Sequence, residues 1–351
     1  MQSFLEAGHE VVAIAPRDAY TPFLEEWGCS YQEIQLTGTG THPWEELQVV
    51  RRFRKIVTEC GADILLTYTI KINIYGILAA RNAGIPIICN VSGLGTVFLW
   101  KGLVSYVARI LYRLTFSRAS FVFFQNEEDK DLFLKTIALP ETKVGLLPGS
   151  GINLMEYSVQ PYQPGPNPIF LMIARVLEDK GVREFVGAAR QVHQLFPNCV
   201  FRLVGGMDEP HPRGIKQREV DEWVQQGWIQ YGGHTDEVAG EIGRADVIVL
   251  PSYREGTPRS LLEGAAMGRA LIATDVPGCH QVVKNNYNGL LCAPYSAESL
   301  AGAILQYCGM NDQEKIEMAR NSRTFVEQFF DEKLVIGLYQ QKIRELTFIE
   351  Q

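Results

Sequence analysis

The chain has 351 residues, of which 46% are hydrophobic and 21% are charged, with a formal net charge of −7. This length and composition predict an ordinary globular protein of about two domains and exclude collagen-like, coiled-coil and disordered classes. The acidic balance also argues against a dedicated nucleic-acid-binding protein, which is usually basic, so we expect no nucleic-acid partner.

In the first half of the chain, short apolar runs alternate with longer amphipathic segments. Met1–Ala7 has the pattern of the end of a helix, which Gly8 would close as its C′ residue. Later segments predicted as helices are Trp44–Cys60, Ile74–Ala83, Leu103–Arg118 and Glu127–Thr136. The predicted strands are Val11–Ala15, Tyr31–Leu36, Ile64–Thr67, Ile85–Cys89, Phe121–Phe124 and Lys143–Leu147.

The second half repeats this alternation after a stretch rich in proline and glycine at 148–167, where we place the linker. Its predicted helices include Val182–Leu195, Glu219–Gln226, Leu261–Met267 and Ala297–Cys308. Its predicted strands are Ile169–Ala174, Val200–Gly205, Trp228–Tyr231, Val247–Pro251, Ala270–Thr274 and Gly289–Cys292.

Alternating strands and helices with nearly continuous apolar strands predict the α/β class. We expect two doubly wound Rossmann-like domains, whose parallel sheets are covered by helices on both faces. The first domain is expected over residues 1–150 and the second over 151–331, with a final helix at 332–347 that packs back on the first. Ligands in such folds bind outside the carboxyl ends of the strands, so a cleft between the domains is the expected site.

Metal and disulfide chemistry are not predicted. The seven cysteines form no C-x-x-C pair, and the six histidines show no ligand spacing, so we expect reduced thiols and no metal. Asp129-Lys130-Asp131 is interpreted as charge near the start of a helix, where it suits the helix dipole. Reduced thiols are typical of the cytosol, so we expect a cytoplasmic protein. Since no run of 18 apolar residues occurs, we expect no membrane-spanning segment.

The most informative stretch lies around Glu255 and Glu263, after the strand Val247–Pro251. A strand, a glycine-containing loop and a helix start leave backbone N–H groups free for an anion. Thr257 and Pro258 are expected to be the N-cap and the first residue of that helix. The two carboxylates suit the hydroxyls of a sugar or ribose. The alternative is that both are solvated surface charges.

Arg175 and Lys180 follow the strand Ile169–Ala174, where the cleft would open. The guanidinium of Arg175 can form two parallel hydrogen bonds and the Lys180 ammonium supplies a point charge, and both suit a diphosphate. The alternative is that Lys180 forms a weak surface pair with Glu178 or Asp179.

A third candidate follows the strand Ile85–Cys89. Its glycines would permit close backbone approach to a ligand, although an irregular turn explains the same pattern. The residues expected on this acceptor or phosphate side are Asn90, Ser92, Gly93 and Gly95.

The charge distribution marks a basic surface. No Asp or Glu occurs from Ile64 to Asn126, whereas this span contains Lys71, Arg81, Lys101, Arg109, Arg113 and Arg118. A basic and apolar helix at Leu103–Arg118 suits an anionic bilayer or a lipid-linked phosphate. A buried core helix whose arginines extend to the surface is the equal alternative.

Taken in order, these motifs resemble those of the GT-B glycosyltransferases of family 4. Glu255 and Glu263 match the family's E-x7-E pattern, and Arg175 with Lys180-Gly181 matches its R-x4-K-G element. The segment 148–153 is similar to the P-N-G-V-D turn before the second domain. The likeness runs nearly from end to end, and the ordered set is far more specific than any one motif.

The resemblance implies sugar transfer from a nucleotide donor with retention of configuration, without a metal, a cofactor or a protein nucleophile. By position, Arg175 and Lys180 would bind the donor diphosphate and stabilise the departing charge. Glu255 would contact the donor sugar and Glu263 the ribose. The segment expected to help hold the sugar and phosphate is Gly256, Thr257, Pro258, Arg259 and Ser260.

Two segments, 91–98 and Thr274–Cys279, resemble one bacterial branch of this family. That branch adds N-acetylgalactosamine or related sugars to undecaprenyl-diphosphate-linked glycans. We therefore expect a UDP-sugar donor, an N-acetylhexosamine as the transferred sugar, and a lipid-linked or polysaccharide acceptor. Peripheral binding to the inner membrane face would use Lys101, Arg109, Arg113 and Arg118. The histidine that many members carry after the strand matching Ile85–Cys89 is absent, so the acceptor-side base is unassigned.

The resemblance also leads us to expect that the first domain lacks its first strand and loop, with weak stability or activity for these 351 residues. A catalytically impaired, nucleotide-sugar-binding remnant is therefore the main alternative function. A nucleotide-sugar epimerase of the same fold is a lesser one. A nicotinamide oxidoreductase would need a G-x-G-x-x-G turn after a strand, which we do not find.

Overall fold

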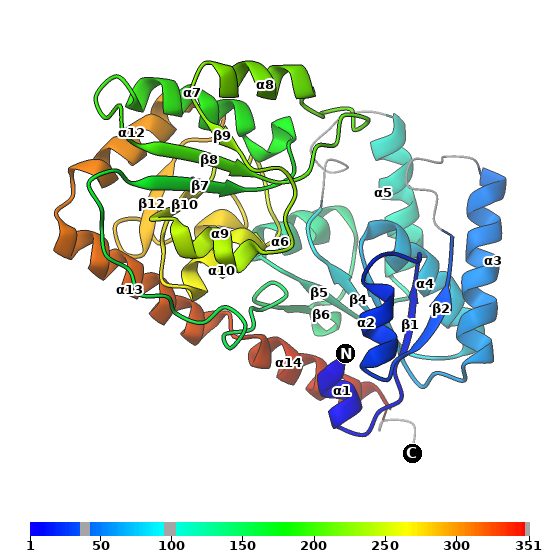
Figure 1. Cartoon of the computed structure of the whole chain (residues 1–351). Helices are drawn as coiled ribbons and strands as arrows, with labels where there is room; N and C mark the ends of the chain where they lie inside the picture. The colour runs from blue at the N-terminus through cyan, green and yellow to red at the C-terminus, as the bar shows by residue number, and fades with distance from the viewer. Residues whose placement is uncertain (36–42, 95–102, 348–351) are drawn as a thin grey trace. The chain divides into compact units, whose positions relative to one another are not determined.

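The computed structural model describes residues 1–35, 43–94 and 103–347, which form two compact units (Figure 1). The first unit comprises the described residues up to Phe124, the segment Lys130–Leu146 and the chain from Ile336 onward. The second comprises Gln125–Asp129 and Leu147–Val335. Each unit combines parallel strands with helices, which confirms the predicted α/β class.

The second unit contains six strands that are all parallel to their neighbours within the described residues. They are β7 (Ile169–Ile173), β8 (Val200–Val204), β9 (Gln230–Tyr231), β10 (Val247–Leu250), β11 (Ala270–Thr274) and β12 (Gly289–Cys292). Their order in the sheet is β12-β11-β10-β7-β8-β9. The strands β8 and β9 therefore follow β7 on one side, whereas β10, β11 and β12 follow on its other side. Because β10 and β11 are buried at every position, they read as continuous apolar runs.

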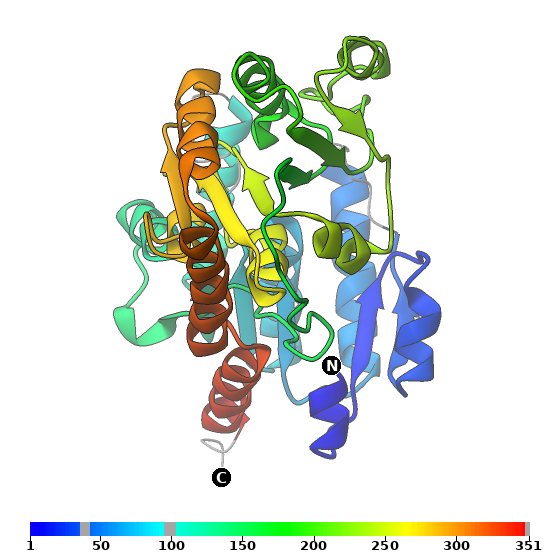
Figure 2. The same ribbon diagram turned by 60° about the vertical axis from the view of Figure 1, so that its left-hand side comes forward.

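Helices cover both faces of this sheet (Figure 2). One face packs against α7 (Val182–Val192), α8 (Gln217–Gln225) and α12 (Ala297–Gly309). The other packs against α9 (Val238–Arg244), α10 (Arg259–Ala266), α11 (Cys279–Val282) and α13 (Asp312–Phe329). A 3₁₀ turn, Glu178–Lys180, leads into α7. This is the doubly wound arrangement that the sequence predicts.

The first unit holds six strands that divide into two parallel sheets in the described part of the chain. A pair is formed by β1 (Val12–Ala15) and β2 (Ser30–Glu33), and the other four are β3 (Leu65–Tyr68), β4 (Ile87–Val91), β5 (Phe121–Phe124) and β6 (Val144–Leu146). Its helices are α1 (Gln2–Glu6), α2 (Thr21–Glu26), α3 (Pro43–Glu59), α4 (Ile70–Ala83) and α5 (Leu103–Phe116), with a 3₁₀ turn at Glu141–Lys143. Helix α6 (Glu127–Thr136) begins in the second unit and belongs to the first from Lys130 onward. As predicted, Gly8 follows α1 with a positive φ of 85°.

The last helix, α14 (Glu332–Thr347), begins in the second unit and continues into the core of the first. The Tyr339 hydroxyl accepts a hydrogen bond of 2.9 Å from Asn90 Nδ2, and its ring lies 5.1 Å from that of Phe123. Burial raises the pKa of Tyr339 well above its usual value. The end of α14 is therefore an integral part of the first unit.

Several predicted boundaries were wrong by a few residues. The strand expected at Trp228–Tyr231 is only Gln230–Tyr231, and α7 ends at Val192 rather than Leu195. The helix expected from Leu261 starts at Arg259. Helix α13 was not predicted, because its many charged residues mask the apolar stripe that it buries.

Candidate functional site

The loops after β7 and β10 meet at the point where strand order reverses in the second unit. Parallel sheets bind ligands at the carboxyl ends of the strands at such a point, because the two loops diverge and leave a crevice. The Tyr253 N–H donates to the carbonyl of Asp179 at 2.9 Å, which ties one loop to the other. Gly181 has a φ of 74°, and a Cβ there would collide with the carbonyl oxygen of Pro251. Glycine therefore lets the loops pack closely.

Lys180 lies in the segment after β7, Glu255 lies in the loop after β10, and the two side chains form an ion pair. Lys180 Nζ lies 2.6 Å from Glu255 Oε1, and the Glu255 side chain is only 12% exposed. The sequence predicts that both residues belong to one site, and the structure brings them together. Lys180 pairs with Glu255 and not, as in the alternative, with Glu178 or Asp179.

Arg175 lies near the beginning of the loop after β7 and is more open to solvent than Lys180. Its Nη1 lies 3.2 Å from Asp208 Oδ2, and its side chain is 62% exposed. A guanidinium held this loosely can reorient toward an anion at low cost, because an exposed ion pair contributes little free energy.

Glu263 is buried on α10 rather than solvated. Its Oε1 accepts from Arg259 Nε at 3.2 Å, one helical turn earlier. Burial raises the pKa of Glu263, while the charge of Arg259 and a hydrogen bond from Tyr157 oppose that rise. The alternative that both Glu255 and Glu263 are surface charges is therefore wrong.

The start of α10 lies beside these carboxylates. Pro258 occupies the N-cap position with an extended ψ of 118°, so the expected N-cap at Thr257 was wrong by one residue. The first-turn N–H groups, beginning with those of Arg259 and Ser260, have no acceptor within the helix and can meet an anion. Gly278 has a φ of 87°, and a Cβ there would collide with the carbonyl oxygens of Glu255 and Gly256. The loop after β11 therefore supports this segment closely.

Two aromatic side chains extend the site. The Tyr253 hydroxyl donates to Glu184 Oε1 at 2.8 Å, and its ring centroid lies 4.0 Å from that of Tyr295. Tyr295 has a positive φ of 60°, an uncommon conformation for a residue with a side chain. Neither residue was predicted from the sequence, although Tyr253 is adjacent to the E-x7-E motif.

A set of polar residues at Gln125–Asp129, which belong to the second unit, was not predicted from the sequence. Asp129 is buried and pairs with Arg254, and Asn126 Nδ2 donates to the Gly256 carbonyl at 3.1 Å. Asp129 therefore does more than suit a helix dipole. Since Asp129 and Arg254 are 125 residues apart, no local pattern indicates the pair.

Nearby, His280 bridges two acidic side chains. Its Nδ1 lies 2.8 Å from Asp275 Oδ1, and its Nε2 lies 2.9 Å from Glu128 Oε1. Gln281 Nε2 also donates to Glu128, at 2.7 Å. These contacts hold α11 against the 125–129 segment.

The expected acceptor-side residues are only partly described. Asn90 lies inside β4 and is buried, so its placement in a loop was wrong. The strand ends at Val91, two residues after the predicted end at Cys89. Ser92 is exposed and Gly93 is half-buried, both directly after β4. Gly95 lies outside the described residues.

Of the four expected membrane-facing residues, Arg109 and Arg113 lie on α5 and Arg118 follows it. Lys101 is outside the described residues. Arg109 is half-buried, whereas Arg113 and Arg118 are exposed. Arg113 Nη2 donates to the Thr136 carbonyl at 3.0 Å, and Arg118 Nη1 donates to the Leu114 carbonyl at 2.7 Å. The helix is not buried on all sides, so the alternative of a core helix does not describe it.

Comparison with known proteins identifies the family. Residues 155–324 match the model for glycosyl transferases group 1, and residues 1–149 match that for the glycosyl transferase 4-like domain. The chain is 30% identical to the N,N'-diacetylbacillosaminyl-diphospho-undecaprenol alpha-1,3-N-acetylgalactosaminyltransferase of Campylobacter jejuni, over 94% of this chain and 89% of that protein. It is 24% identical to the UDP-Gal:alpha-D-GlcNAc-diphosphoundecaprenol alpha-1,3-galactosyltransferase of Escherichia coli, over 79% of this chain and 74% of that one.

Solved structures show the same fold. Sucrose-phosphate synthase from Thermosynechococcus elongatus superposes with a TM-score of 0.81 at 20% identity, covering 100% of this chain and 92% of that one. Anabaena Alr3699/HepE, crystallised with UDP and glucose, gives a TM-score of 0.77 at 18% identity, covering 95% and 92%. These results confirm the predicted GT-B fold and the predicted branch. The chain belongs to the group 1 family of glycosyltransferases and is an enzyme that transfers a hexosyl group.

Proposed function

We propose that this glycosyltransferase moves a sugar, an N-acetylhexosamine in our assignment, from a UDP-sugar to a lipid-diphosphate-linked glycan. We further propose that the reaction retains anomeric configuration and needs neither a metal nor a cofactor. The observation that carries the proposal is the Lys180–Glu255 pair of 2.6 Å at the strand reversal of the second unit. The names of the Campylobacter and Escherichia relatives support a polyprenyl-diphosphate acceptor and, for the second, a UDP-linked donor.

The donor is proposed to replace one ion pair by another. Without donor, the Lys180 ammonium is neutralised by Glu255. A diphosphate carries more negative charge than a carboxylate and would attract Lys180 and the exposed Arg175 guanidinium. Glu255 would then be free to accept a hydrogen bond from a donor-sugar hydroxyl, and Glu263 would accept one from the ribose.

In the reaction, the bond between the sugar C1 and the diphosphate oxygen breaks, and the acceptor hydroxyl attacks on the face that UDP leaves. Lys180, Arg175 and the first-turn amides of α10 would stabilise the charge that develops on the diphosphate. Positive groups fixed before the reaction lower the barrier because they need little reorganisation as the charge appears. The acceptor proton would pass to a diphosphate oxygen of the departing UDP.

Donor profiling tests this function. Thermal shift across UDP-, GDP- and ADP-sugars should give the largest stabilisation with a UDP-sugar, because a ligand that binds only the folded state raises its stability. Transfer to a polyprenyl-diphosphate-linked glycan should then follow, with product anomer assigned by NMR and activity unchanged in EDTA. UDP binding without transfer would favour a catalytically impaired remnant. Interconversion of UDP-sugars without acceptor would favour an epimerase.

We also propose that α5 binds the membrane that carries the acceptor. No helix in the described residues has the length and apolar character of a membrane span. On α5, an exposed stripe of apolar side chains recurs at helical spacing: Tyr106, Val107, Ile110, Leu111 and Leu114. Arg113 and Arg118 flank it. An apolar stripe with basic flanks is the pattern of a helix that lies in the headgroup region of an anionic bilayer.

The double variant Arg113→Gln/Arg118→Gln is expected to bind anionic vesicles about 30-fold more weakly, since each basic residue near such a surface contributes about 1 kcal/mol. Co-sedimentation with phosphatidylglycerol vesicles measures this, and neutral phosphatidylcholine vesicles should show a smaller difference. Arg218→Gln on α8 is the matched control, because that arginine is 90% exposed but lies in the other unit. Equal binding by all three proteins would contradict the membrane assignment.

A further inference from the structure

Two cysteines of the second unit lie next to each other although they are 109 residues apart in the chain. Cys199 Sγ lies 4.0 Å from Cys308 Sγ. Cys199 directly precedes β8, and Cys308 is the penultimate residue of α12. Both are free thiols. They lie at the ends of their elements, where a small backbone shift costs least.

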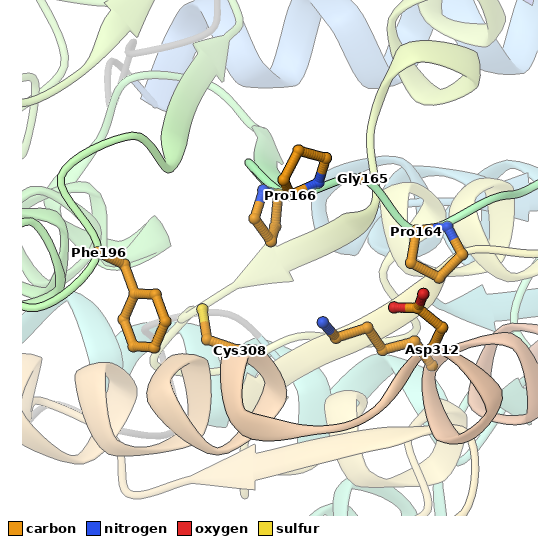
Figure 3. A pocket seen from close by; sticks show the side chains of 8 residues that line it. Pro164, Gly165, Pro166, Phe196, Cys308 and Asp312 are labelled. Carbon is orange, nitrogen blue, oxygen red and sulfur yellow. The ribbon is translucent and has the colours of Figure 1, made fainter.

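One of these thiols opens into a hollow on the surface of the second unit (Figure 3). Its volume is about 340 Å³, and Cys308 points into it between Phe196 and Pro166. Cys199 is only 6% exposed and belongs to the hydrophobic core of the second unit, against which the partly buried Cys308 packs. The hollow is large enough to admit a small oxidant to the pair.

Within this pair, the surroundings favour the thiolate at Cys199. A hydrogen bond from Cys308 lowers the pKa of Cys199; burial opposes this, and the charge of Lys315 supports it. Lys315 is itself buried and lines the same hollow. By contrast, burial alone accounts for most of the rise in the pKa of Cys89 and Cys292, each to about 12. The hydrogen bond to Cys199 and burial raise the pKa of Cys308. Because a thiolate is the nucleophilic form of cysteine, Cys199 is the thiol of the pair that is set to attack.

We propose that Cys199 and Cys308 form a redox-modification site, in which a peroxide converts the two thiols into a disulfide inside the second unit. The thiolate of the pair attacks one peroxide oxygen, the O–O bond breaks, and a sulfenic acid and hydroxide form. The second thiol attacks the sulfenic sulfur and expels water. Overall, two thiols lose two electrons and two protons, and hydrogen peroxide becomes two water molecules.

The geometry needs only a local closure. The sulfur atoms must approach from 4.0 Å to the disulfide bond length of about 2.05 Å. The new bond would join the beginning of β8 to the end of α12. Because it closes a long loop, it would restrict the unfolded chain strongly and raise the melting temperature of the second unit. None of the residues placed in the sugar-transfer site belongs to the pair.

Peptide mapping of the full chain tests the proposal. The protein is treated with hydrogen peroxide, blocked with iodoacetamide and digested with trypsin and Glu-C without reduction. Cleavage after Glu298 separates Cys308 from Cys292, so the expected product links peptide 191–202 to peptide 299–314. We expect about tenfold more of this linked peptide than of any other cysteine pair, with a higher melting temperature that dithiothreitol reverses.

The variants separate this pair from general oxidation. Cys308→Ser should remove both the linked peptide and the thermal shift, and Cys308→Ala provides a second variant if the serine protein does not fold. Cys60→Ser is the matched control, since Cys60 is a half-buried thiol of the first unit, and it should leave the linkage intact. Recovery of Cys199 and Cys308 as alkylated thiols after Cys60 has been oxidised would overturn the proposal. So would their recovery as sulfonic acids without a linked peptide.

Discussion

Lys180→Ala is expected to lower kcat/KM by about 30-fold or more, equivalent to about 2 kcal/mol or more of lost transition-state stabilisation. The variant removes the ammonium that lies 2.6 Å from Glu255 and that we assign to the donor diphosphate. The uncompensated carboxylate of Glu255 would then also repel the donor. Steady-state kinetics with a saturating acceptor measures the loss, and thermal shift with UDP reports donor binding separately.

Companion variants show whether the loss comes from the site. Lys180→Arg keeps the charge and should recover part of the activity. Arg175→Ala should have a smaller effect than Lys180→Ala, because the more exposed guanidinium is better screened by solvent. Lys216→Ala changes an exposed lysine of the same unit and should leave both measurements unchanged. If Lys180→Ala had wild-type kinetics and a normal UDP shift, the diphosphate would bind elsewhere.

Asp129→Ala is expected to destabilise the second unit by about 3–5 kcal/mol, because it leaves the Arg254 charge without its buried partner. The Asp129 side chain is 1% exposed and that of Arg254 is 18% exposed. Arg254 Nε is also buried and has no hydrogen-bond partner among the described residues, so the carboxylate carries much of the compensation for this charge. Urea unfolding followed by circular dichroism and tryptophan fluorescence measures the change.

Two further proteins make that prediction specific. Glu222→Ala removes an exposed i,i+4 partner of Arg218 and should change stability by less than about 1 kcal/mol. Adding Arg254→Met to Asp129→Ala should restore much of the loss, because the buried charge is then absent. If Asp129→Ala and Glu222→Ala had equal effects, the buried pair would not stabilise the fold as argued.

The parts of the site that sequence reasoning found are those fixed by local chain geometry. Lys180 and Glu255 each follow an apolar strand by a short, defined distance, and parallel strands place such residues at one edge of the sheet. Arg254 stands next to Glu255 in the sequence, yet its partner Asp129 could not be predicted. That pairing depends on tertiary packing of a segment that the pattern assigns to the other half of the chain.

Prediction of the fold likewise succeeded where a local pattern decides the structure and failed where tertiary pairing decides it. The second unit was predicted closely, because its strands are buried on both faces and form clear apolar runs. Asn90 was placed wrongly, because a polar residue ends an apolar run whether or not the backbone pairing continues; here Asn90 pairs with Phe123 in the ladder. The division of the first unit into a strand pair and a four-stranded sheet was also not predicted, since periodicity shows that strands exist but not which ones pair.

The path of α14 has a consequence for the order in which the protein folds during synthesis. Tyr339 and Ile343 are buried parts of the first unit, and Lys342 lies 4.1 Å from the ring centroid of Phe121. These residues leave the ribosome after the whole of the second unit, which ends at Val335. The unit whose sequence comes first therefore completes its core last. Until then, the surface that will receive α14 is exposed on the nascent chain and available to chaperones.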